Sequence, residues 1–317
     1  MTDQTLTIHA LETRSERRSE RRDFFKAMIG AAAVATPVVT LTMNGTPLHA
    51  QAAPSDGDVL NFALNLEYLE AQFYFYAVFG QGLPNDLLTG TGTQGAVSGG
   101  RAVAFSDPLV AQYAREIALD ELEHVRFLRT ALGSAAVAQP AIDVSAAPNG
   151  AFSNAARAAG LVGPNQPFDP YSSDENFLLG AFIFEDVGVT AYKGASPLIT
   201  NKTFLEAAAG ILAVEAYHAS IVRTTLFRKG IQTPALIDAT EAISNARDSL
   251  DGSSDLDQGV RPIGTASNIV PLDANGLAFS RSAGQVLNIV YLNRMAVTAG
   301  GFFPNGVNGP IRTSAAN

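Results

Sequence analysis

Two histidines carry the clearest chemical signal in this sequence. His124 lies three residues after Glu121, and His218 lies three residues after Glu215. Residues three apart on a helix share one face, with Cβ atoms about 5–6 Å apart. Carboxylate and imidazole are ligands that suit iron, manganese or zinc. Each pair therefore predicts a metal-binding unit, whose side chains bind one ion together or bridge two.

An internal repeat connects these two pairs to two further glutamates. When Glu67 is aligned with Glu185, each is followed seven residues later by a tyrosine, Tyr74 or Tyr192. When Glu121 is aligned with Glu215, the matches continue through His124/His218, Arg129/Arg223, Thr130/Thr224 and Leu132/Leu226. Self-similarity at a long period indicates a repeated structural unit. We predict that a two-helix unit occurs twice in the chain.

Four long helices must position these side chains. Segments rich in alanine and leucine run from about residue 56 to 80, 107 to 133, 173 to 194 and 202 to 230. Capping residues and glycines stand near their ends, for example Asp107 before Pro108 and Gly80 after the first segment. No comparable run of strand alternation follows residue 52. The sequence predicts an all-α fold.

The segments between and after these helices differ in length. A loop rich in glycine and threonine covers residues 81–106, and residues 134–172 separate the second helix from the third. A connection this long can carry the chain back along a bundle. Beyond residue 230 we expect a fifth helix at about 236–250, a polar linker at 251–258, a segment at 282–293 and a tail rich in glycine and proline. These features predict a long crossover and a C-terminal extension of helix and coil.

The N-terminus is typical of an export signal. A basic stretch with Arg21 and Arg22 precedes an uncharged run from Ala27 to Met43, and Ala50-Gln51-Ala52 has the small-residue pattern of a cleavage site. The run is short, alanine-rich and interrupted by a proline, so it does not predict a membrane span. The arginine pair is similar to the twin-arginine signal, which exports folded proteins. We expect residues 1–52 to be removed and the protein to be periplasmic or otherwise exported.

The amino-acid composition limits which partners the protein can bind and which side chains can ligate a metal. Residues 1–52 hold five acidic and six basic residues, so the remaining chain has 25 acidic residues, 15 basic residues and a net charge of −10. This balance argues against nucleic acid or an anionic membrane as partner. The chain has no cysteine, which excludes disulfides, thiolate metal sites and iron–sulfur clusters. Any metal must be held by carboxylate and imidazole.

The combined pattern resembles that of a known superfamily. One glutamate from each of two helices, with Glu-x-x-His from each of the other two, is similar to the ligand pattern of the ferritin-like di-metal carboxylate proteins. The stretches FSRSAGQVLNIVYL and GGFFPNGVNGPI resemble, within it, an exported bacterial branch related to desiccation-associated stress proteins. The resemblance implies a ferritin-like antiparallel four-helix bundle at residues 53–230, with a long crossover between its second and third helices. Residues 231–317 are then an extension that packs on the bundle.

The resemblance also implies one centre with two divalent metal ions. Four carboxylates in an apolar core would be untenable if left charged and unpaired, and two divalent ions supply +4 against −4. In the superfamily the Glu-x-x-His glutamates typically bridge the metals, here Glu121 and Glu215. We expect iron or manganese rather than zinc. The six predicted ligands are Glu67, Glu121, His124, Glu185, Glu215 and His218.

Five further residues are candidates for the surroundings of this centre. Asp120 and Asp186 are expected to accept a hydrogen bond from the second ring nitrogen of a histidine. Tyr74 and Tyr192 either hydrogen-bond a ligand or pass an electron, as in ferritin-like proteins, or are core aromatics with satisfied hydroxyls. Glu70 shares a face with Glu67 and is either a further ligand or, because its repeat partner is a glycine, a residue outside the ligand set or on the surface.

These features predict two alternative functions. A di-iron or di-manganese centre can carry out redox chemistry on O2 or H2O2. Such chemistry would protect the periplasm from oxidative or drying stress. Alternatively, the metals only stabilise the bundle or are sequestered, since metal binding adds to folding free energy. The long loop and the C-terminal extension exceed a compact ferritin subunit, so we expect a possible homo-oligomer but not a 24-subunit cage.

Overall fold

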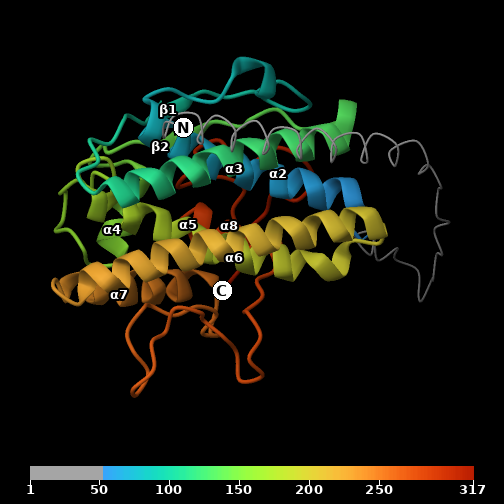
Figure 1. Ribbon diagram of the computed structural model, residues 1–317. Coiled ribbons are helices and arrows are strands. Elements are labelled where there is room, and N and C mark those ends of the chain that lie inside the picture. Colours follow the sequence, from blue (N-terminus) through green and yellow to red (C-terminus); the bar gives the residue numbers. More distant parts are fainter. Residues whose placement is uncertain (1–52) are drawn as a thin grey trace, which may run out of the picture. The chain divides into compact units, whose positions relative to one another are not determined.

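The computed structural model describes residues 53–317, so the predicted signal peptide at residues 1–52 lies outside the described residues. This part of the chain is mainly helical (Figure 1). Its α-helices are α2 (Asp56–Phe79), α3 (Pro108–Leu132), α4 (Ala151–Ala158), α5 (Asp174–Ala195), α6 (Lys202–Gly230), α7 (Ala235–Asp251) and α8 (Ala283–Val290). Short 3-10 helices follow α2 at η2 (Asn85–Leu87), α3 at η3 (Gly133–Ala135) and α5 at η4 (Ser196–Leu198).

Local sequence signals set the limits of the long helices. Ser55 caps α2 in a reciprocal capping box with Asp58, directly before the helix predicted from about residue 56. Gly80 ends the same helix with a φ of 68°, a left-handed conformation that glycine adopts at little cost. Asp107 caps α3, whose first residue is a proline. The helix ends predicted from these residues are thus correct to within about one residue.

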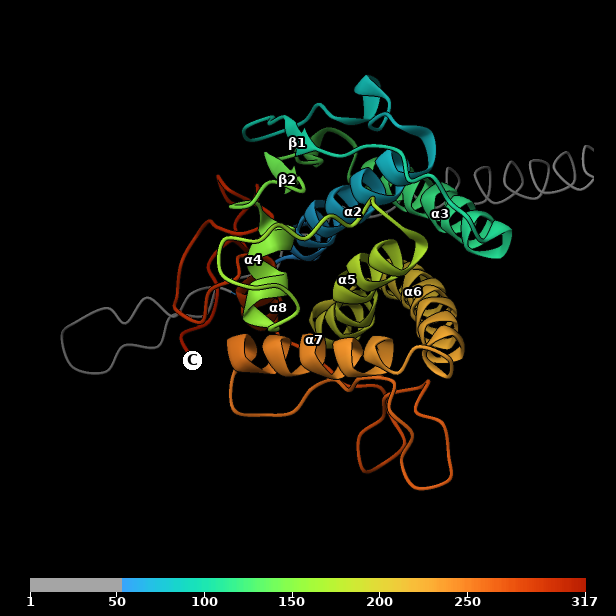
Figure 2. The same cartoon turned by 90° about the vertical axis from the view of Figure 1, so that its left-hand side faces the viewer.

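The four long helices form the predicted ferritin-like bundle. α2 packs mainly on α3, and α5 packs mainly on α6, while α2 also contacts α5 and α3 contacts α6 (Figure 2). The short link through η4 turns the chain so that α6 runs back along α5 (Figure 1). The bundle confirms the all-α fold class. By length and composition α6 could also cross a membrane, but we assign it to the bundle because its Glu215 and His218 are buried there.

The two long connections meet outside the bundle. The loop after α2 contains β1 (Val97–Gly99), and the crossover after α3 contains β2 (Ile142–Val144). The two strands pair in parallel, with Val97 opposite Ile142. These strands are too short to give a visible alternation pattern, which is why the sequence predicted no strand. The crossover between α3 and α5 also contains α4, and together the two connections cover one side of the bundle.

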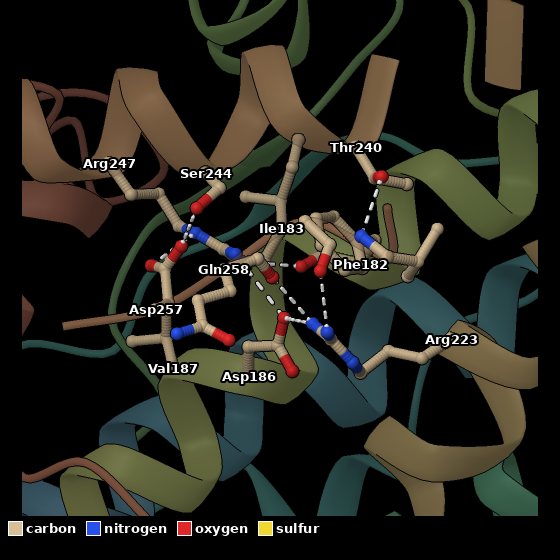
Figure 3. Close-up of polar contacts among 12 residues, drawn as sticks. Phe182, Ile183, Asp186, Val187, Arg223, Thr240, Ser244, Arg247, Asp257 and Gln258 are labelled. Atoms are coloured by element: carbon tan, nitrogen blue, oxygen red, sulfur yellow. Dashed lines mark hydrogen bonds and ion pairs between the residues drawn. The ribbon is translucent and has the colours of Figure 1, made fainter. Parts of the chain in front are cut away.

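The C-terminal extension is joined to α5 and α6 by a buried group of charges. We call this group the arginine cluster, and it consists of Arg223, Arg247 and Arg281 with Asp186, Asp251 and Asp257. Arg223 donates to Asp186 at 2.8 Å (Figure 3). It also donates to four backbone carbonyls of residues 258–269. All six side chains are at most 3% exposed. Three positive and three negative charges therefore balance one another in the protein interior.

Candidate metal centre

The six predicted ligands lie together inside the bundle. Each of the four long helices supplies one glutamate, and α3 and α6 also supply one histidine each. All six are buried, with exposed fractions of 1% or less for the glutamates, 8% for His124 and 2% for His218. The helical spacing that suggested the set thus brings it to one place, although the binding of metal by these residues stays a prediction.

Their ligand atoms form two overlapping groups. Glu67, Glu121, His124 and Glu215 make one group, and Glu185, Glu215 and His218 make the other, with the potential ligand atoms of each group within 4.8 Å of one another. Glu215 belongs to both. Glu121 also reaches both histidines, because its Oε2 lies 3.5 Å from His124 Nδ1 and its Oε1 lies 3.0 Å from His218 Nδ1. Glu121 and Glu215, the two glutamates expected to bridge the metals, are thus the two that lie near ligand atoms of both groups.

Most of the potential metal-ligand atoms at the centre of this site have no hydrogen-bond partner among the described residues. Among the described residues, both oxygens of Glu121, both oxygens of Glu215, Glu185 Oε2 and His218 Nδ1 are buried and make no hydrogen bond. His218 Nδ1 and Glu121 Oε1 are only 3.0 Å apart, yet they are not aligned for one. Leaving buried polar atoms unsatisfied costs about 1–3 kcal/mol each, more for charged groups. Clustered carboxylate and imidazole donors of this kind fit divalent cations.

Without metal, protons must compensate the crowded carboxylates. Burial raises the pKa of Glu67 to about 7 and that of Glu185 to about 8. The pKa of Glu215 is raised well above its usual range, first by burial and then by the charges on Glu121 and its neighbours. Since cations and protons compete for the same oxygens, a metal that binds here must displace these protons.

The pKa values of Glu121 and the two histidines are shifted so as to favour their charged forms, unlike those of the other glutamates in the site. Burial opposes the charge on Glu121, but the nearby His124 and His218 lower its pKa below the usual range. Burial would likewise lower the pKa of His218, but Asp120 and Glu121 raise it to about 10. The pKa of His124 is raised for the same reason by Glu67 and Glu121, although burial opposes this. The metal-free site therefore places one ionised glutamate between two protonated histidines.

Two tyrosines cross the bundle to reach the glutamates of the opposite repeat. Tyr74 of α2 donates a hydrogen bond to Glu185 of α5, and Tyr192 of α5 donates one to Glu67 of α2. Both rings are buried. The structure thus places the hydroxyls on the ligand set, as in the first of the alternatives drawn from the sequence. Each bond leaves the second oxygen of its glutamate facing a histidine, at 3.1 Å for Glu67 and 3.8 Å for Glu185.

The two aspartates proposed to orient the histidines have different positions. Asp120 Oδ2 lies 3.4 Å from His218 Nε2, so the expected contact is present on α6. The expectation for Asp186 needs correction, because its carboxylate binds Arg223 and Arg247 of the arginine cluster (Figure 3). Successive residues on a helix are about 100° apart, so the neighbour of Glu185 faces away from the metal centre. No short motif in the sequence predicted this cluster, since its acceptors include backbone carbonyls of a coil.

Glu70 is the residue that breaks the repeat. It is 6% exposed, which rules out the surface position considered from the sequence. A Cβ at its repeat partner Gly188 would lie 3.4 Å from Glu70 Oε1 and only 2.3 Å from Glu215 Oε2. Burial and then the charges on Glu121, Glu185 and Glu67 raise the pKa of Glu70 well above its usual range. A glycine at 188 therefore leaves room for the carboxylate of Glu215, and Glu70 Oε1 lies at van der Waals distance from the same position.

The six candidate ligands differ in their exposure to solvent. The side chain of His124 is 10% exposed, against 3% for His218 and at most 2% for the four glutamates. Asp120, which lies next to Glu121 on α3, has a 23% exposed side chain. His124 is therefore the most exposed of the six candidate ligands.

Comparison with known proteins agrees with this geometry. The model of the ferritin-like domain family matches residues 55–228. The chain is 28% identical to the ferritin-like catalase Nec2 of Nesocodon mauritianus over 87% of this chain and 88% of that protein. It is 30% identical to the desiccation-related protein PCC13-62 of Craterostigma plantagineum over 80% of this chain and 83% of that protein. No solved structure matches it significantly. The fold, the buried glutamate and histidine pattern and these relatives together show that the chain belongs to the ferritin-like family and is related to desiccation-related proteins.

Proposed function

We propose that this protein binds two iron or manganese ions at the six-ligand site and disproportionates hydrogen peroxide. The observation that carries the proposal is the set of buried donor atoms of Glu121, Glu185, Glu215 and His218 that have no hydrogen-bond partner among the described residues. Two divalent ions would neutralise the four ligand carboxylates and satisfy these atoms together. The similarity to a protein named ferritin-like catalase, over most of both chains, supports the choice of peroxide as substrate.

The reaction balances as two molecules of peroxide giving two of water and one of O2. The six candidate ligands would hold a pair of redox-active ions, and this pair would supply the two-electron exchange between the two peroxide molecules. The protein itself must hold the ligands and move protons. Tyr74 and Tyr192 hold Glu185 and Glu67 in place through their hydrogen bonds. Asp120 fixes the ring of His218 with Nδ1 toward the centre.

Glu70 is the group placed to carry a proton in this reaction. Its carboxyl lies beside Glu215 at the edge of the ligand set and is kept protonated by burial and by the surrounding carboxylates. A protonated acid in this position can deliver its proton to the oxygen of a cleaved peroxide and recover one from the next molecule.

The test uses purified, metal-loaded protein without residues 1–52. Peroxide consumption and O2 release are measured together, and bound iron and manganese are counted by elemental analysis. Glu121→Ala should abolish both activities and lower the metal content, whereas Glu206→Ala, on the exposed side of α6, should change neither. Glu70→Gln should keep both metals and lower the rate about 100-fold. Equal rates in wild type and Glu121→Ala would refute the catalytic proposal.

A second candidate function is stabilisation of the bundle by metal without turnover. It is favoured by the 30% identity to a desiccation-related protein and by the number of buried atoms that metal would satisfy. Zinc, which has no redox chemistry, distinguishes the two. If zinc-loaded and manganese-loaded protein both melt at a raised temperature and neither consumes peroxide, the structural function stands.

We also propose that the protein is exported by the twin-arginine pathway. The support is the order of the basic stretch, the uncharged run and the small-residue cleavage pattern within residues 1–52. The mass of the protein recovered from the host's exported fraction should correspond to a chain that starts near residue 53. Replacing Arg21 and Arg22 by lysine should leave the full-length chain in the cytoplasm, and unchanged export of this variant would overturn the assignment.

A further inference from the structure

A cavity of about 750 Å³ lies apart from the metal centre. Its walls are the second half of α2 and the loop of residues 81–97, with Gln139 of the crossover at its base. In both Figure 1 and Figure 2 the segment that contains β1 lies on the side of α2 away from α5 and α6. The cavity therefore opens on the opposite face of α2 from Glu67 and Glu70. Cavities of about 300–1,000 Å³ are the usual size for small-molecule sites.

The lining of this cavity is polar but carries no charge. None of the described residues that line it is acidic, basic or a histidine. Five carboxamide side chains contribute to it, namely Gln72, Gln81, Asn85, Gln94 and Gln139. A carboxamide both donates and accepts hydrogen bonds, as a hydroxyl group does. A charged ligand would lose its hydration here without gaining a counter-charge, so the lining favours a neutral ligand with many hydroxyl groups.

The base of the cavity is held in place by two buried amides. Gln72 and Gln139 are each 1% exposed and hydrogen-bond to each other. Gln72 Oε1 also accepts from the backbone N of Leu83 at 3.1 Å, and Gln139 Nε2 donates to the carbonyl of Gly95 at 3.2 Å. These bonds fasten the loop at both sides of the cavity. A binding surface fixed in advance loses less entropy when a ligand arrives.

An aromatic side chain forms one wall. Tyr76 is half-buried, and no described residue hydrogen-bonds to its hydroxyl. Glycines leave room for this ring, because a Cβ at Gly100 would lie 2.6 Å from Tyr76 Cγ and one at Gly82 would lie 3.1 Å from the hydroxyl. Gly100 also has a φ of 85°, which a side chain would make costly. The ring of Phe75 lines the cavity beside it.

We propose that this cavity binds a neutral saccharide of one or two rings. The aromatic side chains offer apolar surface to the C–H face of a sugar ring, while Gln81, Asn85 and Gln94 at the rim bond its hydroxyl groups. The site is independent of the metal chemistry, because α2 separates it from Glu67 and Glu70. Binding should therefore be the same in metal-loaded and metal-free protein.

The experiment measures binding to metal-loaded protein directly, by saturation-transfer NMR and isothermal titration. The probes are glucose, sucrose and trehalose, with glucuronate as the charged comparison. We expect one neutral saccharide to bind at least tenfold more tightly than glucuronate. Asn85→Ala and Tyr76→Phe should each weaken that binding about threefold to tenfold, the worth of one neutral hydrogen bond. Gln232→Ala, which removes an exposed amide after α6, is the matched control and should bind like wild type.

Three results would overturn the proposal. The first is no saturation transfer from any neutral saccharide at tens of millimolar to folded protein. The second is that glucuronate binds as tightly as the neutral saccharides, which would show that the uncharged lining does not select against a charged ligand. The third is binding that neither Asn85→Ala nor Tyr76→Phe changes although circular dichroism shows both variants folded. Direct binding is required because sugars also raise melting temperatures through their exclusion from protein surfaces.

Discussion

The metal centre and the arginine cluster are two buried groups of charges on opposite sides of α5. In the arginine cluster three arginines face three aspartates, and the arginines donate to Asp186, Asp251 and Asp257, to backbone carbonyls and to Thr190. Among the described residues, Arg247 Nε and Asp251 Oδ1 are the only buried side-chain atoms of this cluster that make no hydrogen bond. In the metal centre five carboxyls face two histidines, and most of the central donor atoms have no hydrogen bond. The first group is neutral by itself, and the second reaches neutrality only with protons or cations. An unbalanced buried charge therefore points to a ligand, whereas a balanced one indicates a structural role.

The largest effect is expected from breaking the balanced group. Arg223→Met leaves Asp186 buried without its closest partner and frees four backbone carbonyls. Removing one partner of a buried ion pair costs about 3–5 kcal/mol. The free energy of unfolding in urea should fall by that amount with and without metal. A loss below about 1 kcal/mol would show that the cluster does not stabilise the fold.

Removing the cations should have the next largest effect, and only on the unbalanced group. Chelation should lower the free energy of unfolding by up to about 4 kcal/mol if metal was present at a thousand times its dissociation constant. The change should appear as a drop in melting temperature on the order of 10 °C. Glu215→Ala, which removes a glutamate shared by both groups of ligands, should already melt low and respond little to chelation. If a chelator lowered the melting temperatures of wild type and Glu215→Ala equally, this would argue against metal binding at this site.

The pH dependence of stability should change direction when metal is removed. In the metal-free protein Glu67 and Glu185 have pKa values of about 7 and about 8, above the unfolded value near 4.3. Their protonated forms are favoured by folding, so this contribution is complete below pH 4 and is lost as the pH rises through 7 and 8. Metal binding needs the ionised forms and strengthens over the same range. Melting curves from pH 6 to 9 with and without chelator should diverge, and parallel curves would contradict the assignment.

The smallest effect is expected from the one surplus carboxylate beside the arginine cluster. Asp248 lies 3.9 Å from Arg281, and burial, followed by the charge on Asp257, raises its pKa to about 7. Ionising Asp248 therefore lowers stability as the pH rises toward 7 and beyond. Asp248→Asn keeps an acceptor for the backbone N of Leu256 and should raise the melting temperature slightly at pH 8 but not at pH 5. An equal shift at both values would show that charge is not the cause.

The bundle and the convergence of the six candidate ligands were predictable because both follow from helical spacing. Glu121 and His124 share a face of α3 wherever that helix lies, and the repeat requires a second pair to meet the first. The assignment of Asp186 to the metal centre was wrong because adjacency in sequence was taken for adjacency in space. The burial of Glu70 depends on how the other helices pack around α2, which no spacing rule contains. The backbone carbonyls that accept from Arg223 lie in coil, whose path hydrophobic periodicity does not predict.

The placement of Glu185 and Asp186 also limits how this chain can change in length. These neighbours on α5 face two different buried groups, so the rotation of α5 about its axis is fixed from both sides. Inserting or deleting one residue within α5 would turn one half of the helix by about 100° relative to the other. No such turn would keep both Tyr192 on Glu67 and Asp186 on Arg223, since the first contact lies toward the bundle interior and the second toward α7. Length variation among relatives of this protein should therefore gather in the loops at residues 81–106 and 134–172 and be absent from α5.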